Sequence, residues 1–180
     1  MKHIEKHIEP PLQHLFDLGD LGQAGAVVTV EAGPDERTAV ASWAGVDSVQ
    51  RFTGTVTLRR LSQSRFNYDA DLIADVTQSC VVTLEPVKSR IARKISRELH
   101  LAPRLPPDQA GELTLSAGDD DVPETITSLE YDLAAPLLEE FALGIDPYPR
   151  KAGVAFAAPV EPEAPQSSPF AVLKVLKDRD

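Results

Sequence analysis

The chain has 180 residues, enough for one domain of ordinary size, and its 42% apolar residues can build a core, which excludes a wholly disordered protein. Its formal net charge of −10 disfavours indiscriminate binding to nucleic acid or anionic membranes, and no apolar run approaches the roughly 20 residues of a membrane-spanning helix. The first residues, MKHIEKHIEPPLQHL, lack the apolar stretch of a signal peptide, and a single cysteine is typical of a reducing compartment, so we expect a cytoplasmic protein.

The first half of the chain predicts one short helix among strands. Residues 24–33 are rich in valine and end in glycine, as in a strand, and residues 34–45 begin with proline and end with glycine, as in a helix. We expect Trp43 to pack this helix onto the core. Apolar and polar residues alternate in residues 49–61 and again in residues 65–87, which is typical of an antiparallel sheet with one exposed face.

The next segment, residues 87–103, fits two structures. Ile91, Ile95 and Leu99 recur every four residues, which suits one face of a helix. The same residues also lie at even spacing, which suits one face of a strand. Periodicity alone therefore leaves both open.

The last third predicts a loop, a helix, a linker and a second helix. Residues 103–127 are acidic and rich in proline and glycine, and a helix with a buried leucine stripe follows over residues 132–144. Residues 151–167 are small, proline-rich and without period, as in a linker, whereas residues 168–180 fit a short amphipathic helix. We therefore expect a single domain over residues 1–150, followed by a tethered helix.

Basic and acidic residues are unevenly distributed. Between Arg51 and Arg104 there are ten Lys/Arg and five Asp/Glu, whereas residues 105–149 contain eleven Asp/Glu and no Lys or Arg. Such asymmetry indicates interaction rather than fold. The candidate RNA-binding residues, which could contact phosphates, are Lys88, Arg90, Arg93, Lys94 and Arg97. Neutralisation of the acidic part of the same molecule explains these cations equally well, and no interleaved aromatic residues provide a base-stacking platform.

The terminal segment offers a second candidate contact. Phe170, Leu173 and Leu176 share one face of the predicted tail helix. This face could dock onto the core of the same chain, or it could bind the groove of a partner protein. The sequence does not separate these two interpretations.

No residue pattern predicts a catalytic or metal site. Cys80, Val82 and Leu84 alternate with Ser79, Val81 and Thr83, as in a strand. No histidine lies within 19 residues of Cys80, so we interpret it as a small apolar residue buried in a strand. His3 and His7 have the spacing of a shared metal site on a helix, but the prolines at 10 and 11 would cut that helix short. The acidic run 119–121 lacks the ligand spacing of a calcium loop. We expect no enzyme activity, no cofactor and no metal.

Several stretches resemble the YceD family, described as large ribosomal RNA subunit accumulation proteins. The most specific are CVVTLEPV, which begins at Cys80, and DPYPRK, which follows the predicted helix. The likeness covers roughly residues 10 to 151 and the tail, in the same order. It implies a bacterial protein of the alphaproteobacterial type, connected with the large ribosomal subunit and its 23S rRNA, in a family without established enzymes.

The resemblance also bears on Cys80. Many members of the family have a CxxC-like pair at this strand and further cysteines after the later helix, which look like zinc ligands. In this chain Cys80 matches the first cysteine, Thr83 stands at the second position, and PYPRKAG (147–153) stands where the later cysteines would be. The resemblance therefore implies a lineage without this metal, and it favours a strand for residues 87–101.

Together these observations predict an α+β fold, with a curved antiparallel β-sheet that becomes barrel-like if it closes, two or three flanking helices and a tethered C-terminal helix. The resemblance implies a noncatalytic factor that supports accumulation or processing of 23S rRNA by binding rRNA or a ribosomal or assembly protein. The alternative is an acidic protein–protein adaptor without direct RNA contact. The sequence leaves the oligomeric state open.

Overall fold

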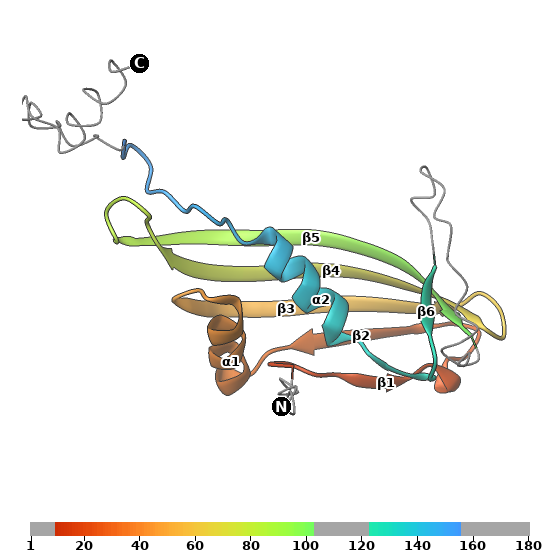
Figure 1. Cartoon of the computed structure of the whole chain (residues 1–180). Helices are drawn as coiled ribbons and strands as arrows, with labels where there is room; N and C mark the ends of the chain where they lie inside the picture. Colours follow the sequence, from red (N-terminus) through yellow and green to blue (C-terminus); the bar gives the residue numbers. More distant parts are fainter. Residues whose placement is uncertain (1–9, 103–122, 156–180) are drawn as a thin grey trace, which may run out of the picture.

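The computed structural model of the chain describes residues 10–102 and 123–155, and its main element is a long, curved, five-stranded sheet (Figure 1). Strand order in this sheet is β2-β3-β4-β5-β6, and all neighbours are antiparallel except β5 and β6. The strands are β2 (Ala26–Glu31), β3 (Ser48–Arg60), β4 (Arg65–Ser79), β5 (Pro86–Leu101) and β6 (Glu124–Ile126). The fold is α+β, as the sequence predicts.

The remaining elements are short and pack around this sheet. They are β1 (Leu15–Asp17), a 3-10 helix η1 (Leu18–Asp20), helix α1 (Pro34–Ala44), β7 (Glu130–Asp132) and helix α2 (Ala134–Gly144). Strands β1 and β7 pair with each other in a separate antiparallel sheet. In the described residues, no helix is long and apolar enough to cross a bilayer.

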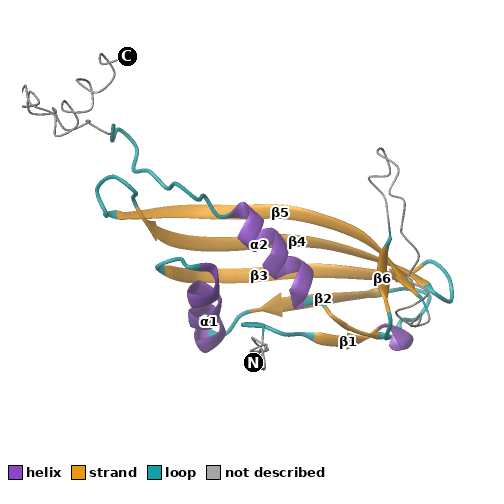
Figure 2. Ribbon diagram, in the orientation of Figure 1, coloured by secondary structure: helices purple, strands orange, loops and turns teal. Residues whose placement is uncertain are grey.

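The two faces of the large sheet differ because side chains alternate along each strand. Its inner face is crossed by α2 (Figure 2). The buried side chains on this face include Phe52, Val56, Leu58, Phe66, Tyr68, Leu72, Ile91, Ile95 and Leu99. The intervening residues form the outer face, where polar and charged side chains are largely exposed. Both helices contribute to the inner core, so neither covers the outer face.

Helix α2 approaches β3 closely because a glycine stands beneath it. A Cβ atom on Gly54 would clash with the side chain of Leu137, which would have to shift to accept a larger residue. Beside this contact, the rings of Phe52 and Phe141 meet edge to face with centroids 5.4 Å apart. Pro136 lies in the first turn of α2, where its missing N–H is harmless.

Helix α1 agrees with its predicted range, but the role predicted for Trp43 is wrong. The helix ends at Gly45, whose φ of 67° is left-handed and suits glycine. Its buried residues are Val40 and Ala41, and Trp43 is 44% exposed. The helix is amphipathic through its small aliphatic residues, so the large indole lies at the boundary with solvent.

Of three further predictions, one is confirmed and two are wrong. Residues 87–101 are a strand, as the family resemblance favours. The barrel-like closure is wrong because, within the described part of the chain, β2 pairs only with β3, while β1 pairs with β7, so the sheet stays open. The placement of Cys80 within a strand is also wrong, since β4 ends at Ser79 and Cys80 lies in the turn before β5.

Some predictions concern residues outside the described ranges. The candidates His3 and His7, the acidic run 119–121 and Arg104 are among them, as is the whole terminal helix 168–180 with Phe170, Leu173 and Leu176. The predicted linker 151–167 is described only as far as residue 155.

Candidate functional site

Strand β5 carries all five candidate RNA-binding residues, and the alternation of the strand divides them between two faces. Lys88, Arg90 and Lys94 lie on the outer face, in register with Thr77, Asp75 and Asp71 of β4. Arg93 and Arg97 lie on the inner face, in register with Leu72 and Tyr68. The single stripe that a helix would form is therefore absent, and the cations flank the strand from both sides.

On the outer face, carboxylates of β4 already pair with two of these cations. Nε of Arg90 lies 2.7 Å from Oδ1 of Asp75, and Nζ of Lys94 lies 3.5 Å from Oδ1 of Asp71. The hydrogen bond from Arg90, with a smaller contribution from the charge of Arg51, lowers the pKa of Asp75. On the outer face, β4 thus places anions beside the cations of β5 and beside Arg51 of β3.

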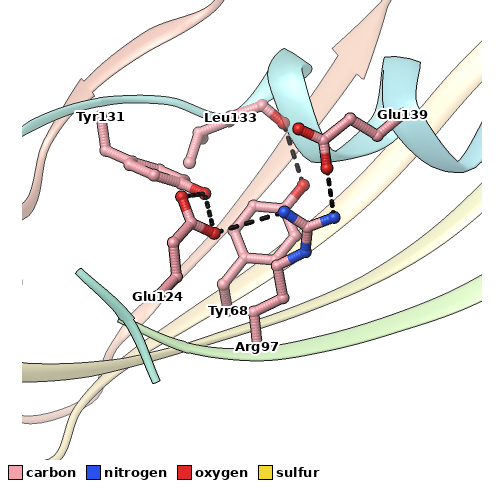
Figure 3. A network of polar contacts seen from close by, with 6 residues as sticks. All are labelled: Tyr68, Arg97, Glu124, Tyr131, Leu133 and Glu139. Atoms are coloured by element: carbon pink, nitrogen blue, oxygen red, sulfur yellow. Dashed lines mark hydrogen bonds and ion pairs between the residues drawn. The ribbon is translucent and has the colours of Figure 1, made fainter. Parts of the chain in front are cut away.

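On the inner face, Arg97 is the centre of a polar network (Figure 3). Its guanidinium forms ion pairs with Glu124 of β6, at 3.3 Å, and with Glu139 of α2, at 2.5 Å. Burial on its own would lower the pKa of Arg97, but the hydrogen bonds and charges of the two glutamates raise it. Its side chain is only 24% exposed, so Arg97 joins three elements of the fold.

Two tyrosines complete this network beneath Arg97. The hydroxyl of Tyr68 donates to the backbone oxygen of Leu133 at 2.9 Å, and the hydroxyl of Tyr131 lies 3.2 Å from Oε1 of Glu124 (Figure 3). Their rings meet edge to face with centroids 6.1 Å apart. Burial raises the pKa of both hydroxyls, so they remain neutral donors. The network attaches β6, β7 and α2 to the sheet.

Two of the five cations have no such internal partner. Arg93 and Lys88 form no ion pair with any residue in the described ranges, and Arg93 is exposed beside the buried Ile91 and Ile95. These side chains remain available to an external anion. Of the predicted set, the structure therefore leaves Lys88 and Arg93 accessible, engages Arg90 and Lys94 at the surface, and uses Arg97 internally.

The turn that contains Cys80 is adjacent to the segment that follows α2. The backbone N–H of Lys151 donates to the Cys80 sulfur at 3.4 Å, the N–H of Val81 donates to the oxygen of Pro149, and Lys151 forms an ion pair with Glu85. The thiol is shielded from solvent at the periphery, outside the main core cluster. Hydrogen bonds from the Thr83 side chain and from backbone N–H groups lower the pKa of Cys80 to about 6.

The donors around Cys80 do not suit zinc. A structural zinc ion needs about four thiolate, imidazole or carboxylate ligands, whereas here the sulfur faces a hydroxyl and backbone N–H groups. In the described parts of the chain, no group of three His, Cys, Asp or Glu residues is arranged to hold a metal. The two segments that the family resemblance brings together do meet, but as a hydrogen-bonded contact.

Sequence reasoning missed the internal use of Arg97 and the roles of Tyr68 and Tyr131. The alternation in β4 predicts that Tyr68 is buried, but the partners of its hydroxyl come from residues far along the chain. Charge counting indicated that acidic residues after position 105 could neutralise the basic segment, and Glu124 and Glu139 are two such residues. The pairing could not be assigned without the crossing of α2 over the sheet.

Comparison with known proteins gives one family match. The sequence pattern of the family described as "Large ribosomal RNA subunit accumulation protein YceD" matches residues 68–177, which is more than half of the chain. The matched range begins within β4 and includes β5, α2 and the segment beside Cys80. No curated protein and no solved structure matches the chain.

Proposed function

Because the chain belongs to the YceD family of large ribosomal RNA subunit accumulation proteins, we propose that it supports accumulation of this RNA by binding a protein partner along strand β5. Membership in the family indicates a role related to ribosome biogenesis. In this proposal the chain binds its protein partner in the cytoplasm and catalyses no reaction.

The distribution of charge on the sheet favours a protein partner over RNA. A phosphate chain lying on the outer face would meet Asp69, Asp71 and Asp75 of β4 next to the cations of β5. Arg97 is held by two glutamates, so it cannot add to a phosphate-binding patch without breaking the network. The net charge of −10 opposes a long polyanion such as RNA more strongly than a short segment with a few carboxylates. A protein surface can match such an alternating pattern residue by residue.

The surroundings of Cys80 support a function without catalysis. A nucleophilic thiol needs both a general base or other activating group and access for a substrate. The sulfur of Cys80 is hydrogen-bonded to Thr83 and to the N–H of Lys151, and it is shielded from solvent. This arrangement suits a sulfur that holds the turn together.

A second candidate is direct contact with large-subunit rRNA, and a specific observation favours it. Lys88 and Arg93 have no ion-pair partner among the described residues, and Arg90 and Lys94 lie beside them with largely exposed side chains. These four cations could contact phosphates with a steep dependence on salt. Replacing Arg93, Lys94 and Arg97 together would not test this cleanly, because Arg97 is structural.

The test places a photo-crosslinking amino acid at Ala92, an exposed position on β5, in the source cells. The control carries the same group at Val27, which is 70% exposed on β2 at the opposite side of the sheet. We expect a crosslink from position 92, but not 27, to a protein of the large-subunit assembly particles, and it should survive ribonuclease treatment. In parallel, depletion of the chain should lower large-subunit rRNA relative to small-subunit rRNA.

Two results would contradict the proposal. A crosslink from position 92 to rRNA alone would replace the protein partner with the second candidate. An unchanged ratio of the two rRNAs after depletion would remove the role in accumulation for this chain.

A further inference from the structure

Strand β5 lies at the edge of the large sheet over most of its length. Its pairing with β4 is continuous from Pro86 to His100, whereas β6 pairs with it only at Leu99, His100 and Leu101. Within the described residues, nothing pairs with the other side of Val87–Glu98 (Figure 1). A long strand with one unpaired side is a template for a further strand.

The direction of the unpaired backbone groups follows from two hydrogen bonds at the end of β5. The N–H of Leu101 donates to Ser64, on the side of β4, and the N–H of Ala102 donates to Ile126 of β6. Because direction alternates along a strand and the register with β4 has no shift, the even-numbered residues face away from β4. Their N–H and C=O groups point to the open side at Lys88, Arg90, Ala92, Lys94, Ser96 and Glu98.

The start of the strand agrees with this assignment. Pro86 is also even-numbered, so its missing N–H falls on the open side, the place where a sheet tolerates proline. Beyond Pro86, every even-numbered residue as far as Glu98 has both a donor and an acceptor to offer. A strand added here would find an uninterrupted set of hydrogen-bonding partners.

The charged side chains that border this edge determine which charge a strand that pairs with it should have. Lys88, Arg90 and Lys94 border the edge on the outer face, and Arg93 borders it on the inner face. Against these cations the strand carries one acidic residue, Glu98. Two copies of β5 placed side by side would repel each other, so the edge disfavours a second copy of this chain. An acidic segment would be attracted.

We propose that the open edge of β5 accepts an extended acidic segment of a partner protein, which adds to the sheet as a strand beside Val87–Glu98. This inference rests on the proposed function, since it specifies how the protein partner binds. Backbone hydrogen bonds to the even-numbered residues supply much of the affinity, and alternate carboxylates on the outer face, beside Lys88, Arg90 and Lys94, supply the preference for acidic sequences. A phosphate backbone offers acceptors but lacks the regular alternation of donors and acceptors that would continue the ladder.

The test uses the full chain and a synthetic probe. The probe is a fluorescent peptide of alternating valine and glutamate, as long as Val87–Glu98, and its binding is followed by fluorescence anisotropy. Two N-methylated versions, in which alternate amides are blocked in one phase or the other, keep the charge and remove strand hydrogen bonds. We expect one phase to bind at least about tenfold more weakly than the unmodified peptide, and the other phase to bind nearly as well.

A matched pair of variants tests the protein side. In Ala92→Pro the edge N–H is lost and the ring occupies the open side, while the pairing with β4 and every charge are kept. We expect at least about tenfold weaker peptide binding, whereas Ala92→Ser should stay within about twofold. Circular dichroism and thermal unfolding of both variants check that the sheet is intact.

The outcomes separate this inference from the proposed function. Equal binding of both N-methylated phases would mean that charge alone attracts the peptide, and it would overturn strand addition. Binding that appears only after residues 105–121 are replaced by a glycine–serine linker would mean that the chain's own acidic segment occupies the edge, which would also overturn it. For this comparison the crosslinking amino acid is moved to Ser89, another exposed position of β5. If Ala92→Pro weakens the peptide but the crosslink from Ser89 to the protein partner stays intact, strand addition fails and the proposed function stands. If the crosslink goes to RNA, the proposed function fails whatever the peptide does.

Discussion

The two halves of strand β5 differ in their surroundings. From Ile95 to Leu101 the strand pairs with β4, Arg97 joins it to α2, and β6 pairs with its last three residues. From Val87 to Lys94 it pairs with β4 alone and its other edge is open, although α2 contacts its inner face at Ile91 through Gly144. An arginine in the first of these halves stabilises the fold, and the cations in the second border an unpaired edge. A cluster of basic residues in a sequence can therefore serve two purposes within one strand.

Arg97→Met should have the largest effect on the stability of the fold, because it leaves Glu124 and Glu139 without their cation. We expect the free energy of unfolding to fall by about 2 kcal/mol, less than for a fully buried pair because both glutamates are partly exposed. Arg93→Met is the matched control, with the same change four residues away, and should cost less than about 0.5 kcal/mol. Urea unfolding measures both. Equal losses would show that the two halves of β5 do not differ as described.

The same comparison shows how far sequence reasoning reaches. Alternation in residues 49–61 and 65–79 predicts two strands and their buried faces, because the period of a strand is local. The period of β5 is compatible with a helix as well, since Ile91, Ile95 and Leu99 satisfy both, and the family resemblance was needed to choose. The partners of Arg97 depend on residues 27 and 42 positions away, which no local pattern encodes.

The candidate site shows the same limit. The sequence identifies the cations of residues 88–97 but cannot say which of them are neutralised, because that depends on the register with β4. It also gives no sign that β5 lies at an edge, since the order of strands is set by the whole sheet. The buried state of Cys80 was predicted, but its location in a turn was not, because the alternation of apolar residues continues past the end of β4.

Tyr68→Phe tests how much the polar network at the Ile95–Leu101 half of β5 contributes to stability. The substitution removes the hydroxyl that donates to the Leu133 oxygen at the start of α2, so this buried acceptor keeps its intrahelical hydrogen bond but loses the one from Tyr68. We expect the unfolding free energy to fall by about 1 kcal/mol. Tyr148→Phe removes a hydroxyl from a side chain that is 70% exposed, and it should have no measurable effect. A neutral result for Tyr68→Phe would mean that the network in Figure 3 adds little beyond the packing of its rings.

Arg90→Gln should have the smallest effect on stability, because its ion pair with Asp75 lies in the open half and is exposed to solvent. Its effect on titration is larger and has a definite sign. Arg90 lowers the pKa of Asp75 through a hydrogen bond, so the pair stabilises the folded chain above the unfolded pKa of the carboxyl, and this contribution is lost as pH falls through the lower folded value. Carboxyl NMR should therefore show the pKa of Asp75 rising in Arg90→Gln.

Lys94→Gln is the matched control for this titration, because its ion pair is with Asp71 and leaves the hydrogen bond to Asp75 in place. The pKa of Asp75 should stay low in this variant. If Arg90→Gln instead destabilised the fold as much as Arg97→Met, the open half of β5 would be part of the structural framework. Pairing of these cations with an incoming strand would then destabilise the fold. The division of β5 into a structural half, Ile95–Leu101, and a half available for binding, Val87–Lys94, would be wrong.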